Sequence, residues 1–195
     1  MFNEHKKYKI LLSISLLNLL LENSYEEITS ELIIKKTKLK NNNYNWMADD
    51  KVSLLKTYFE SVNDQIISEA YKDFKEDVSA SVNEKMTDII LRFCEFHEDY
   101  KISIKKLYDF NLSSSNFLSL FIYLISDLSK KALKISGGKS FTINDNLILI
   151  GLISTYALIF HKWITVQNKD ISYIMNVADK YVNNAEEFAS NLRII

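Results

Sequence analysis

Four lysines are gathered in a stretch of the chain that contains no acidic residue. The segment Ile33–Trp46 carries Lys35, Lys36, Lys38 and Lys40, and neither aspartate nor glutamate. A local excess of ammonium groups is what binding to nucleic-acid phosphates requires. The chain as a whole has no such excess, because 24 basic and 25 acidic residues give a net charge of −1. Any attraction to a polyanion must therefore be local.

Three consecutive asparagines follow these lysines. The amide groups of Asn41, Asn42 and Asn43 could pair with the edge that adenine presents in the major groove of DNA. An alternative interpretation is that the lysines form a solvated surface and that the asparagines reflect the codon use of an AT-rich genome. These residues by themselves leave both interpretations open.

The elements around the lysines have the order of a helix-turn-helix unit. Thr29 or Ser30 can begin a short helix, because either hydroxyl can accept a hydrogen bond from a backbone amide of the first turn. We expect a turn at Thr37–Lys38 and a second short helix over about Lys40–Met47. A long helix should then begin at Lys51, with Asp49 or Asp50 as its cap.

Composition and periodicity predict an all-α fold. The chain has no proline and three glycines, so few residues would interrupt a helix. Ser81 and Glu84 have the spacing of a capping box. We expect about nine helices. Besides the two short helices, the expected ranges are Glu4–Leu21, from Lys51 to between Lys72 and Asp77, Ser81–Phe96, Ile102–Phe110, Phe117–Ile135, Leu147–Thr165 and Ile171–Leu192.

The residues that most often serve enzymes or bind metals are scattered along the chain. His5, His97 and His161 have no metal-ligand spacing. Cys94 is the single cysteine, which excludes an intramolecular disulfide and any cysteine-based metal cluster. We therefore expect no enzymatic activity, no metal site and no cofactor.

Aromatic side chains cluster in the body of the chain, between Phe93 and Trp163. Most should belong to the hydrophobic core, although a helical body rich in bulky side chains can also enclose an apolar ligand. The sequence alone does not separate these two interpretations. The candidate pocket residues are Phe93, Phe96, Tyr108, Phe121, Tyr156, Phe160 and His161.

Two apolar runs require comparison with membrane and export signals. Basic residues precede Ile10–Leu21, but Asn18 interrupts this run and no small-residue cleavage site follows. The run Leu147–Phe160 is too short to span a bilayer. We expect no transmembrane segment and a cytoplasmic protein, and the single cysteine fits a reducing compartment.

The N-terminal part of the chain resembles the TetR family of bacterial transcriptional regulators. That family's pattern runs loosely Y-x-x-x-T, I-A-x-x-A-G-V-S, Y-x-x-F and x-x-K-x-x-L-L. The matching positions are Tyr25, Thr29, Ile33, Leu39, Tyr44, Lys51, Leu54 and Leu55, and Met47 stands near the Phe of Y-x-x-F. The chain departs from the pattern at the turn, where Thr37–Lys38 replaces Ala-Gly, and at Lys40 and Met47, which replace Ser and Phe.

The resemblance implies a helix-turn-helix DNA-binding head over residues 1–48 and a helical ligand-binding and dimerisation body over 49–195. It implies a homodimeric regulator, most often a repressor, that binds duplex DNA and is released by an apolar small molecule. Tyr44 and Lys51 would contact phosphates. The implied DNA-binding residues are Thr29, Lys38, Lys40, Asn41, Asn42, Asn43, Tyr44 and Lys51.

The C-terminal half has a second resemblance. The segment Leu152–Glu187, with Tyr156, Trp163 and Asn168–Ser172, is similar to the accessory proteins of ubiquinone biosynthesis. Those proteins share the TetR fold, hold isoprenoid lipids and do not bind DNA. Their usual Gly-Trp is absent here, because Ser24–Tyr25 occupies that place, and so is their Phe-Pro before the long helix. A lipid-binding accessory protein with a degenerate head is the alternative function, and a dimeric scaffold without a ligand is a third.

Overall fold

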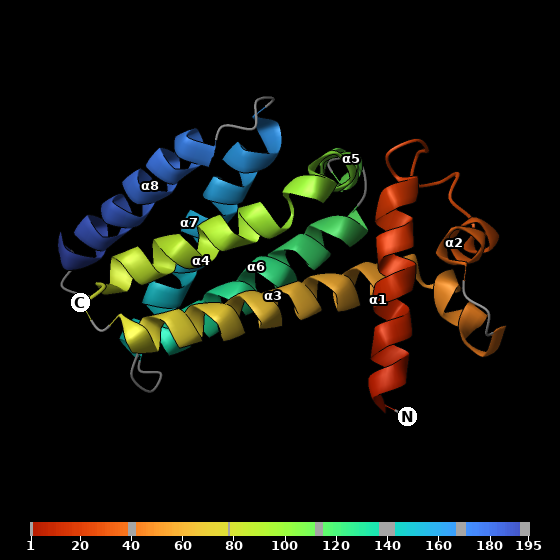
Figure 1. Ribbon diagram of the computed structural model, residues 1–195. Coiled ribbons are helices and arrows are strands. Elements are labelled where there is room, and N and C mark those ends of the chain that lie inside the picture. Colours follow the sequence, from red (N-terminus) through yellow and green to blue (C-terminus); the bar gives the residue numbers. More distant parts are fainter. Residues whose placement is uncertain are drawn as a thin grey trace. The chain divides into compact units, whose positions relative to one another are not determined.

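The described part of the chain is entirely helical. The computed structural model describes residues 2–38, 42–77, 79–111, 115–136, 143–166 and 171–191, and within these ranges no strand occurs. The predicted all-α class is confirmed. The elements, drawn in Figure 1, are α1 (Phe2–Leu19), α2 (Ser30–Thr37), the 3₁₀-helix η1 (Asn42–Asp49), α3 (Lys51–Glu76), α4 (Val82–Phe96), the 3₁₀-helix η2 (Glu98–Tyr100), α5 (Lys101–Asn111), α6 (Ser115–Ile135), α7 (Ile143–Thr165) and α8 (Ile171–Asn191).

The described residues form eight α-helices and two 3₁₀-helices, so the expected count of nine is not confirmed. The second short helix, expected over Lys40–Met47, is the 3₁₀-helix η1 over Asn42–Asp49. Asparagine side chains compete with the backbone for hydrogen bonds and disfavour an α-helix, which accounts for the tighter form. Lys40 and Asn41 lie outside the described residues.

Three predicted helix starts are confirmed by their caps. The Leu32 backbone amide donates to Thr29 Oγ1 at 3.4 Å, and Thr29 is the N-cap of α2. The Ser53 amide donates to Asp50 Oδ1 at 2.9 Å at the start of α3. Ser81 and Glu84 form both hydrogen bonds of the capping box that begins α4. Each cap of this kind contributes about 1 kcal/mol to helix stability.

The chain divides into two compact units. The first comprises Met1–Val62 and Asp99–Leu124, and the second comprises Asn63–Glu98 and Ile125–Ile195. Helices α3 and α6 each contribute residues to both units. The division into a head over residues 1–48 and a body over 49–195 stays a prediction.

The first unit is built around α1, which packs against α2, η1 and α5. Leu16 and Leu17 are fully buried in its core. Two buried hydroxyls connect α1 to its neighbours, because Ser13 Oγ donates to the Leu54 carbonyl and Ser103 Oγ donates to the Leu17 carbonyl, both at 2.6 Å. These bonds keep the polar groups of α1 satisfied inside an apolar core.

The second unit is held together by α4, α7 and α8, which pack against one another. Tyr156 is fully buried, and its hydroxyl donates to the Met86 carbonyl at 2.7 Å. The rings of Phe93 and Phe160 meet with their centroids 6.1 Å apart. Most of the buried residues of α7 are aliphatic or aromatic, so this helix contributes largely apolar side chains to the core of the unit.

Helix α7 is longer than the apolar run recognised in the sequence. Its window Asn146–Thr165, 20 residues, is long and apolar enough to cross a membrane by length and composition, and 44% of that window is buried inside the structure. The expectation of no transmembrane segment, which was based on the shorter run Leu147–Phe160, stays a prediction. Core helices of soluble proteins meet the same criterion, and the buried face of α7 packs on α4 and α8.

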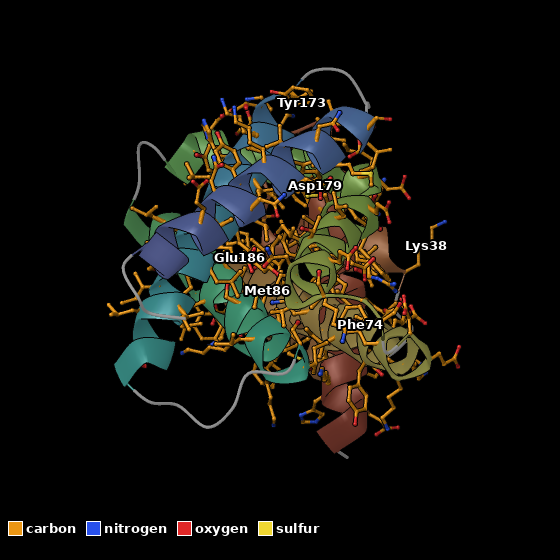
Figure 2. All side chains as sticks on the ribbon, turned by 90° about the vertical axis from the view of Figure 1, so that its left-hand side faces the viewer. Lys38, Phe74, Met86, Tyr173, Asp179 and Glu186 are labelled. Carbon is orange, nitrogen blue, oxygen red and sulfur yellow. The ribbon has the colours of Figure 1, made fainter. Side chains whose placement is uncertain are left out.

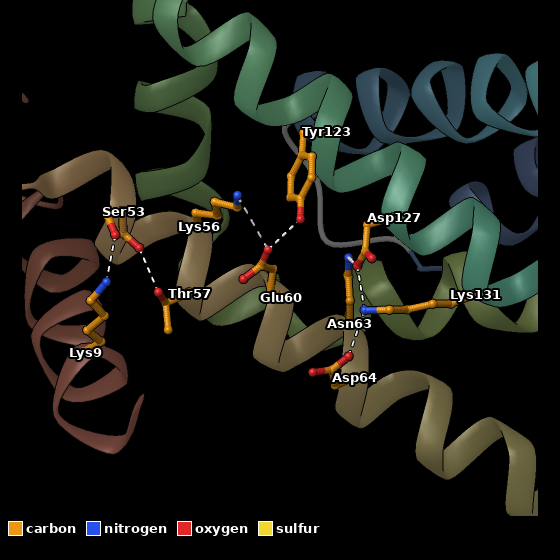
Figure 3. Close-up of polar contacts among 10 residues, drawn as sticks. All are labelled: Lys9, Ser53, Lys56, Thr57, Glu60, Asn63, Asp64, Tyr123, Asp127 and Lys131. Atoms are coloured by element: carbon orange, nitrogen blue, oxygen red, sulfur yellow. Dashed lines mark hydrogen bonds and ion pairs between the residues drawn. The ribbon is translucent and has the colours of Figure 1, made fainter. Parts of the chain in front are cut away.

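Polar contacts join α3 to α6 within each unit (Figure 3). In the first unit the Tyr123 hydroxyl donates to Glu60 Oε1 at 2.7 Å. In the second unit Lys131 Nζ reaches Asp64 Oδ1 and Asp127 Oδ2, each at 2.7 Å. Paired charges of this kind fix the register of the two helices more than they add stability, because they are partly solvated.

Candidate nucleic-acid interface

Helix α2 places two of the four lysines in solvent. Its buried side is formed by Ile33, which is completely inaccessible and packs toward α1 and η1. The opposite side carries Lys35 and Lys36, both exposed and both in the last turn. Cations in the last turn also complement the partial negative charge at the end of a helix.

The turn after α2 places a third lysine in solvent. Lys38 has φ 52° and ψ 31°, the left-handed conformation, and its side chain points away from the fold (Figure 2). Among the described residues it is the only non-glycine with positive φ. This conformation costs an L-residue about 1 kcal/mol. Lys38 thus adopts the backbone conformation that glycine commonly adopts after a helix C-terminus, and the turn carries a cationic side chain.

Element η1 follows with one face in the core and one in solvent. Met47 and Ala48 are buried, with 3% and 1% of their surface exposed, so Met47 fills an apolar position as the phenylalanine of the family pattern would. Ser30 Oγ donates to Asp49 Oδ1 at 2.6 Å and joins the start of α2 to the end of η1. Trp46, in contrast, is 63% exposed.

Several of the predicted DNA-binding residues fall where the structure gives little or no description. Lys40 and Asn41 lie outside the described residues. For Asn42, Asn43 and Tyr44 only the backbone is described, and it forms the first part of η1. Their predicted roles in reading bases or binding phosphate stay predictions.

Lys51 is held inside the fold. Its ammonium donates to the Tyr25 carbonyl at 2.8 Å and to the Ile28 carbonyl at 2.9 Å, and it lies 4.1 Å from the centroid of the Tyr25 ring. Burial lowers the pKa of Lys51, partly offset by the charge of Glu26. These contacts fix the segment before α2 to the start of α3. The position predicted to bind phosphate therefore has a clear structural role.

Tyr25 completes this attachment. Its ring packs against Phe110 with centroids 5.4 Å apart, and burial together with the charge of Asp50 raises the pKa of its hydroxyl to about 12. The Thr29 hydroxyl oxygen accepts the N-cap hydrogen bond of α2. Two residues of the family pattern thus serve to position the short helices, and their match carries information about geometry more than about binding.

The exposed lysines of this region differ from Lys105 and Lys131, which form ion pairs. Lys105 pairs with Asp109 at 2.7 Å, and Lys131 pairs with two aspartates. Within the described ranges no residue forms an ion pair with Lys35, Lys36 or Lys38, or accepts a hydrogen bond from them. Three exposed cations without local neutralisation, within four residues of chain, form a favourable contact surface for a polyanion.

The candidate pocket residues are divided between the two units. Tyr108 and Phe121 belong to the first unit, where their rings lie 6.1 Å apart. The other five belong to the second unit. Of those five, Phe93, Tyr156 and Phe160 are buried core residues, Phe96 is half-buried and His161 is exposed.

Two of the side chains considered as possible reactive groups, His97 and Cys94, are buried in the second unit. His97 is fully buried, its Nδ1 lies 2.7 Å from the Phe93 carbonyl oxygen, and burial lowers its pKa to about 4. Cys94 is a buried thiol. Among the residues that the structure describes, no three histidine, cysteine, aspartate or glutamate side chains are grouped so that they could hold a metal ion.

Comparison with known proteins adds no assignment. No protein-family model matches the sequence, and no curated protein matches it. The resemblance to the TetR family therefore stays a prediction that depends on the spacing of the residues given above. The site has to be interpreted from its own geometry.

The exposure of Trp46 was not predicted from the sequence, because the family pattern has no apolar requirement at this position. One local signal in the sequence could have indicated its exposure. Trp46 lies in a polar, lysine-rich segment, in which a buried position would be unusual.

Proposed function

We propose that this protein is a TetR-like DNA-binding transcriptional regulator that acts as a repressor. The observation that carries the proposal is the end of α2, where Lys38 has a glycine-type conformation and where Lys35, Lys36 and Lys38 are exposed without an ion pair to any described residue. The attachment of Lys51 to the Tyr25–Ile28 carbonyls supports the same geometry, because it fixes α2 to the start of α3.

In this mechanism α2 and η1 approach the major groove, and the lysines neutralise phosphates along its edge. Each neutralised phosphate releases condensed counterions, so affinity should fall steeply as salt is added. Asn41, Asn42 and Asn43 would supply base recognition through their amides. The backbone contacts position the protein, and the asparagines select the sequence.

Repression would require a homodimer that reaches two successive major grooves. Helix α7 supports this, because Leu147, Ile150 and Leu158 lie on one helical face and are 49%, 60% and 49% exposed. A second copy of the chain would remove that apolar surface from water. Sedimentation of the protein as a monomer at micromolar concentration would contradict the dimer.

Release from DNA would follow from an apolar small molecule bound in the body. Such a ligand acts by binding one dimer geometry more tightly than the other and so shifting their populations. The proposed contacts are the aromatic residues of the predicted pocket that belong to the second unit, Phe93, Phe96, Tyr156 and Phe160. Adding candidate effectors to the protein in solution should weaken DNA binding without unfolding its α-helices. Circular dichroism can measure the helix content in the same samples.

The alternative is a lipid-binding accessory protein with a head that no longer binds DNA. Two observations favour it, namely the 3₁₀ form of η1 and the apolar face that α7 exposes. Organic extraction of the purified protein followed by mass spectrometry separates the two functions. A stoichiometric isoprenoid lipid would support the alternative, whereas its absence together with DNA binding would exclude it.

The proposed function is tested by fluorescence anisotropy with labelled duplex DNA at low salt. Wild-type protein should bind, and the triple variant K35A/K36A/K38A should bind much more weakly. A matched control is K72A/K130A/K134A, which removes the same charge from exposed lysines outside this region. No binding by the wild-type protein, or equal losses in both variants, would contradict a DNA-binding head.

A further inference from the structure

The two tryptophans of the chain lie in opposite environments. Trp163 is 1% exposed, and its Nε1–H donates to Glu98 Oε2 at 2.8 Å. Trp46 is 63% exposed, and no residue within the described ranges accepts a hydrogen bond from its indole. Tryptophan is a largely buried residue type on average, and its N–H is a donor only. An exposed indole with its donor in solvent is thus poised for an acceptor outside the fold.

The orientation of Trp46 is imposed by its neighbours. Residues three apart are eclipsed in a 3₁₀-helix, so Trp46 shares a face with Asp49, while Met47 and Ala48 occupy the others. Burial of Met47 and Ala48 in the core leaves Trp46 outward. Asp49 is held toward α2 by its hydrogen bond from Ser30. Exposure of the indole is therefore a consequence of the way η1 packs.

The surroundings of Trp46 identify the chemistry of its partner. Lys38 is the C-cap residue of α2, and η1 begins four residues later at Asn42. The Cα atoms of Lys38 and Asn42 therefore lie at most about 14 Å apart. The segment between Ile33 and Trp46 contains four lysines and no acid, which attracts a polyanion. A phosphodiester oxygen is an acceptor that carries negative charge, and it complements both the lysines and the indole N–H.

We propose that Trp46 contacts the DNA backbone directly, donating from Nε1 to a phosphate oxygen while its ring lies against the adjoining sugar. This inference rests on the proposed DNA-binding function and adds a contact residue to it. The contact sets the position of η1 on the duplex and contributes no base selectivity. Trp46 is therefore a positioning residue for the asparagines that precede it.

The contact can be observed by fluorine NMR of protein labelled with 5-fluorotryptophan. The labelled chain gives two resonances, which the variant W46F assigns. A short mixed-sequence duplex, added at low salt, should shift the Trp46 resonance and reduce its sensitivity to solvent deuterium. The Trp163 resonance should stay unchanged, because its indole is buried and already bonded within the second unit.

Affinity measurements give a second readout. W46F keeps an aromatic ring and loses the donor, so it should weaken duplex binding about tenfold, as expected for one hydrogen bond to a charged acceptor. W46A should weaken binding further. I102A is the matched control, because Ile102 is also 63% exposed, and it should bind as the wild-type protein does. All three variants should keep the thermal midpoint of the wild-type protein.

The outcomes separate this inference from the function on which it rests. If the wild-type protein binds duplex DNA while W46A keeps full affinity and the Trp46 resonance does not move, the contact is wrong and the function stands. If the wild-type protein binds no duplex at all, both are wrong. A Trp46 shift that depends on protein concentration alone would assign the indole to self-association and overturn the contact.

Discussion

At the scale of single residues, the lysines of the candidate interface have distinct tasks. Lys35 and Lys36 are exposed on α2, Lys38 is exposed on a turn with positive φ, and Lys51 is attached to two carbonyls. Only the first three are arranged to meet an external anion. The sequence makes all of them equivalent, and the backbone geometry distinguishes them.

Substitution K38G should stabilise the protein by about 1 kcal/mol, because glycine adopts the left-handed conformation without the steric cost that lysine bears. The free energy of unfolding in urea measures this gain. The control K38A removes the same charge and keeps the Cβ, so it should give no gain. Equal stabilities of K38G and K38A would show that the turn is unstrained.

Substitution K51A should destabilise the protein by about 2 kcal/mol, because the Tyr25 and Ile28 carbonyls lose a charged donor. K105A is the comparison, since it breaks an exposed pair with Asp109 and should cost less than about 0.5 kcal/mol. Thermal unfolding measures both. Unchanged stability of K51A combined with a loss of DNA affinity would return Lys51 to the role of a phosphate contact.

At the scale of elements, local signals in the sequence predicted most helix boundaries. The caps at Thr29, Asp50 and Ser81 were predictable because each depends on a side chain within three residues of the amide it accepts from. The 3₁₀ form of η1 was missed, since it results from several weak helix formers in one short segment. The start of α7 was placed at Leu147 and lies at Ile143, because polar residues at its N-terminal end were not assigned to the helix, whereas its end at Thr165 was predicted.

His97 is the C-cap residue of α4, and its buried imidazole should make the free energy of unfolding depend on pH. Burial lowers the pKa of His97 from its ordinary value of 6.5 to about 4, so the unfolded chain takes up a proton more readily than the native protein between these values. Stability should therefore fall as pH decreases from about 6.5 to 4, by up to about 3 kcal/mol.

Urea unfolding at a series of pH values measures this dependence. The variant H97Q keeps a polar side chain at the helix end and removes the titrating group, so its stability should change less over the same interval. A wild-type profile parallel to that of H97Q would show that other groups, among them the carboxylates, account for the acid sensitivity.

At the scale of the whole molecule, the sequence predicted the all-α class and left the function open. Absence of proline and a helical period in most segments were sufficient for the class. The candidate interface was predictable in its lysines, because charge clusters are visible in sequence, but not in Trp46 or Lys51. The exposure of Trp46 depends on burial of the residues beside it, and the role of Lys51 depends on carbonyls that lie 23 and 26 residues away in the chain.

The most direct test of the central claim is the salt dependence of duplex binding. The logarithm of the association constant should fall linearly with the logarithm of salt concentration, and K35A/K36A/K38A should reduce that slope by about 2.7, which corresponds to three phosphate contacts. K72A/K130A/K134A should leave the slope unchanged. A wild-type protein that shows no salt-dependent binding, or a slope that both triple variants change equally, would contradict DNA binding through this turn.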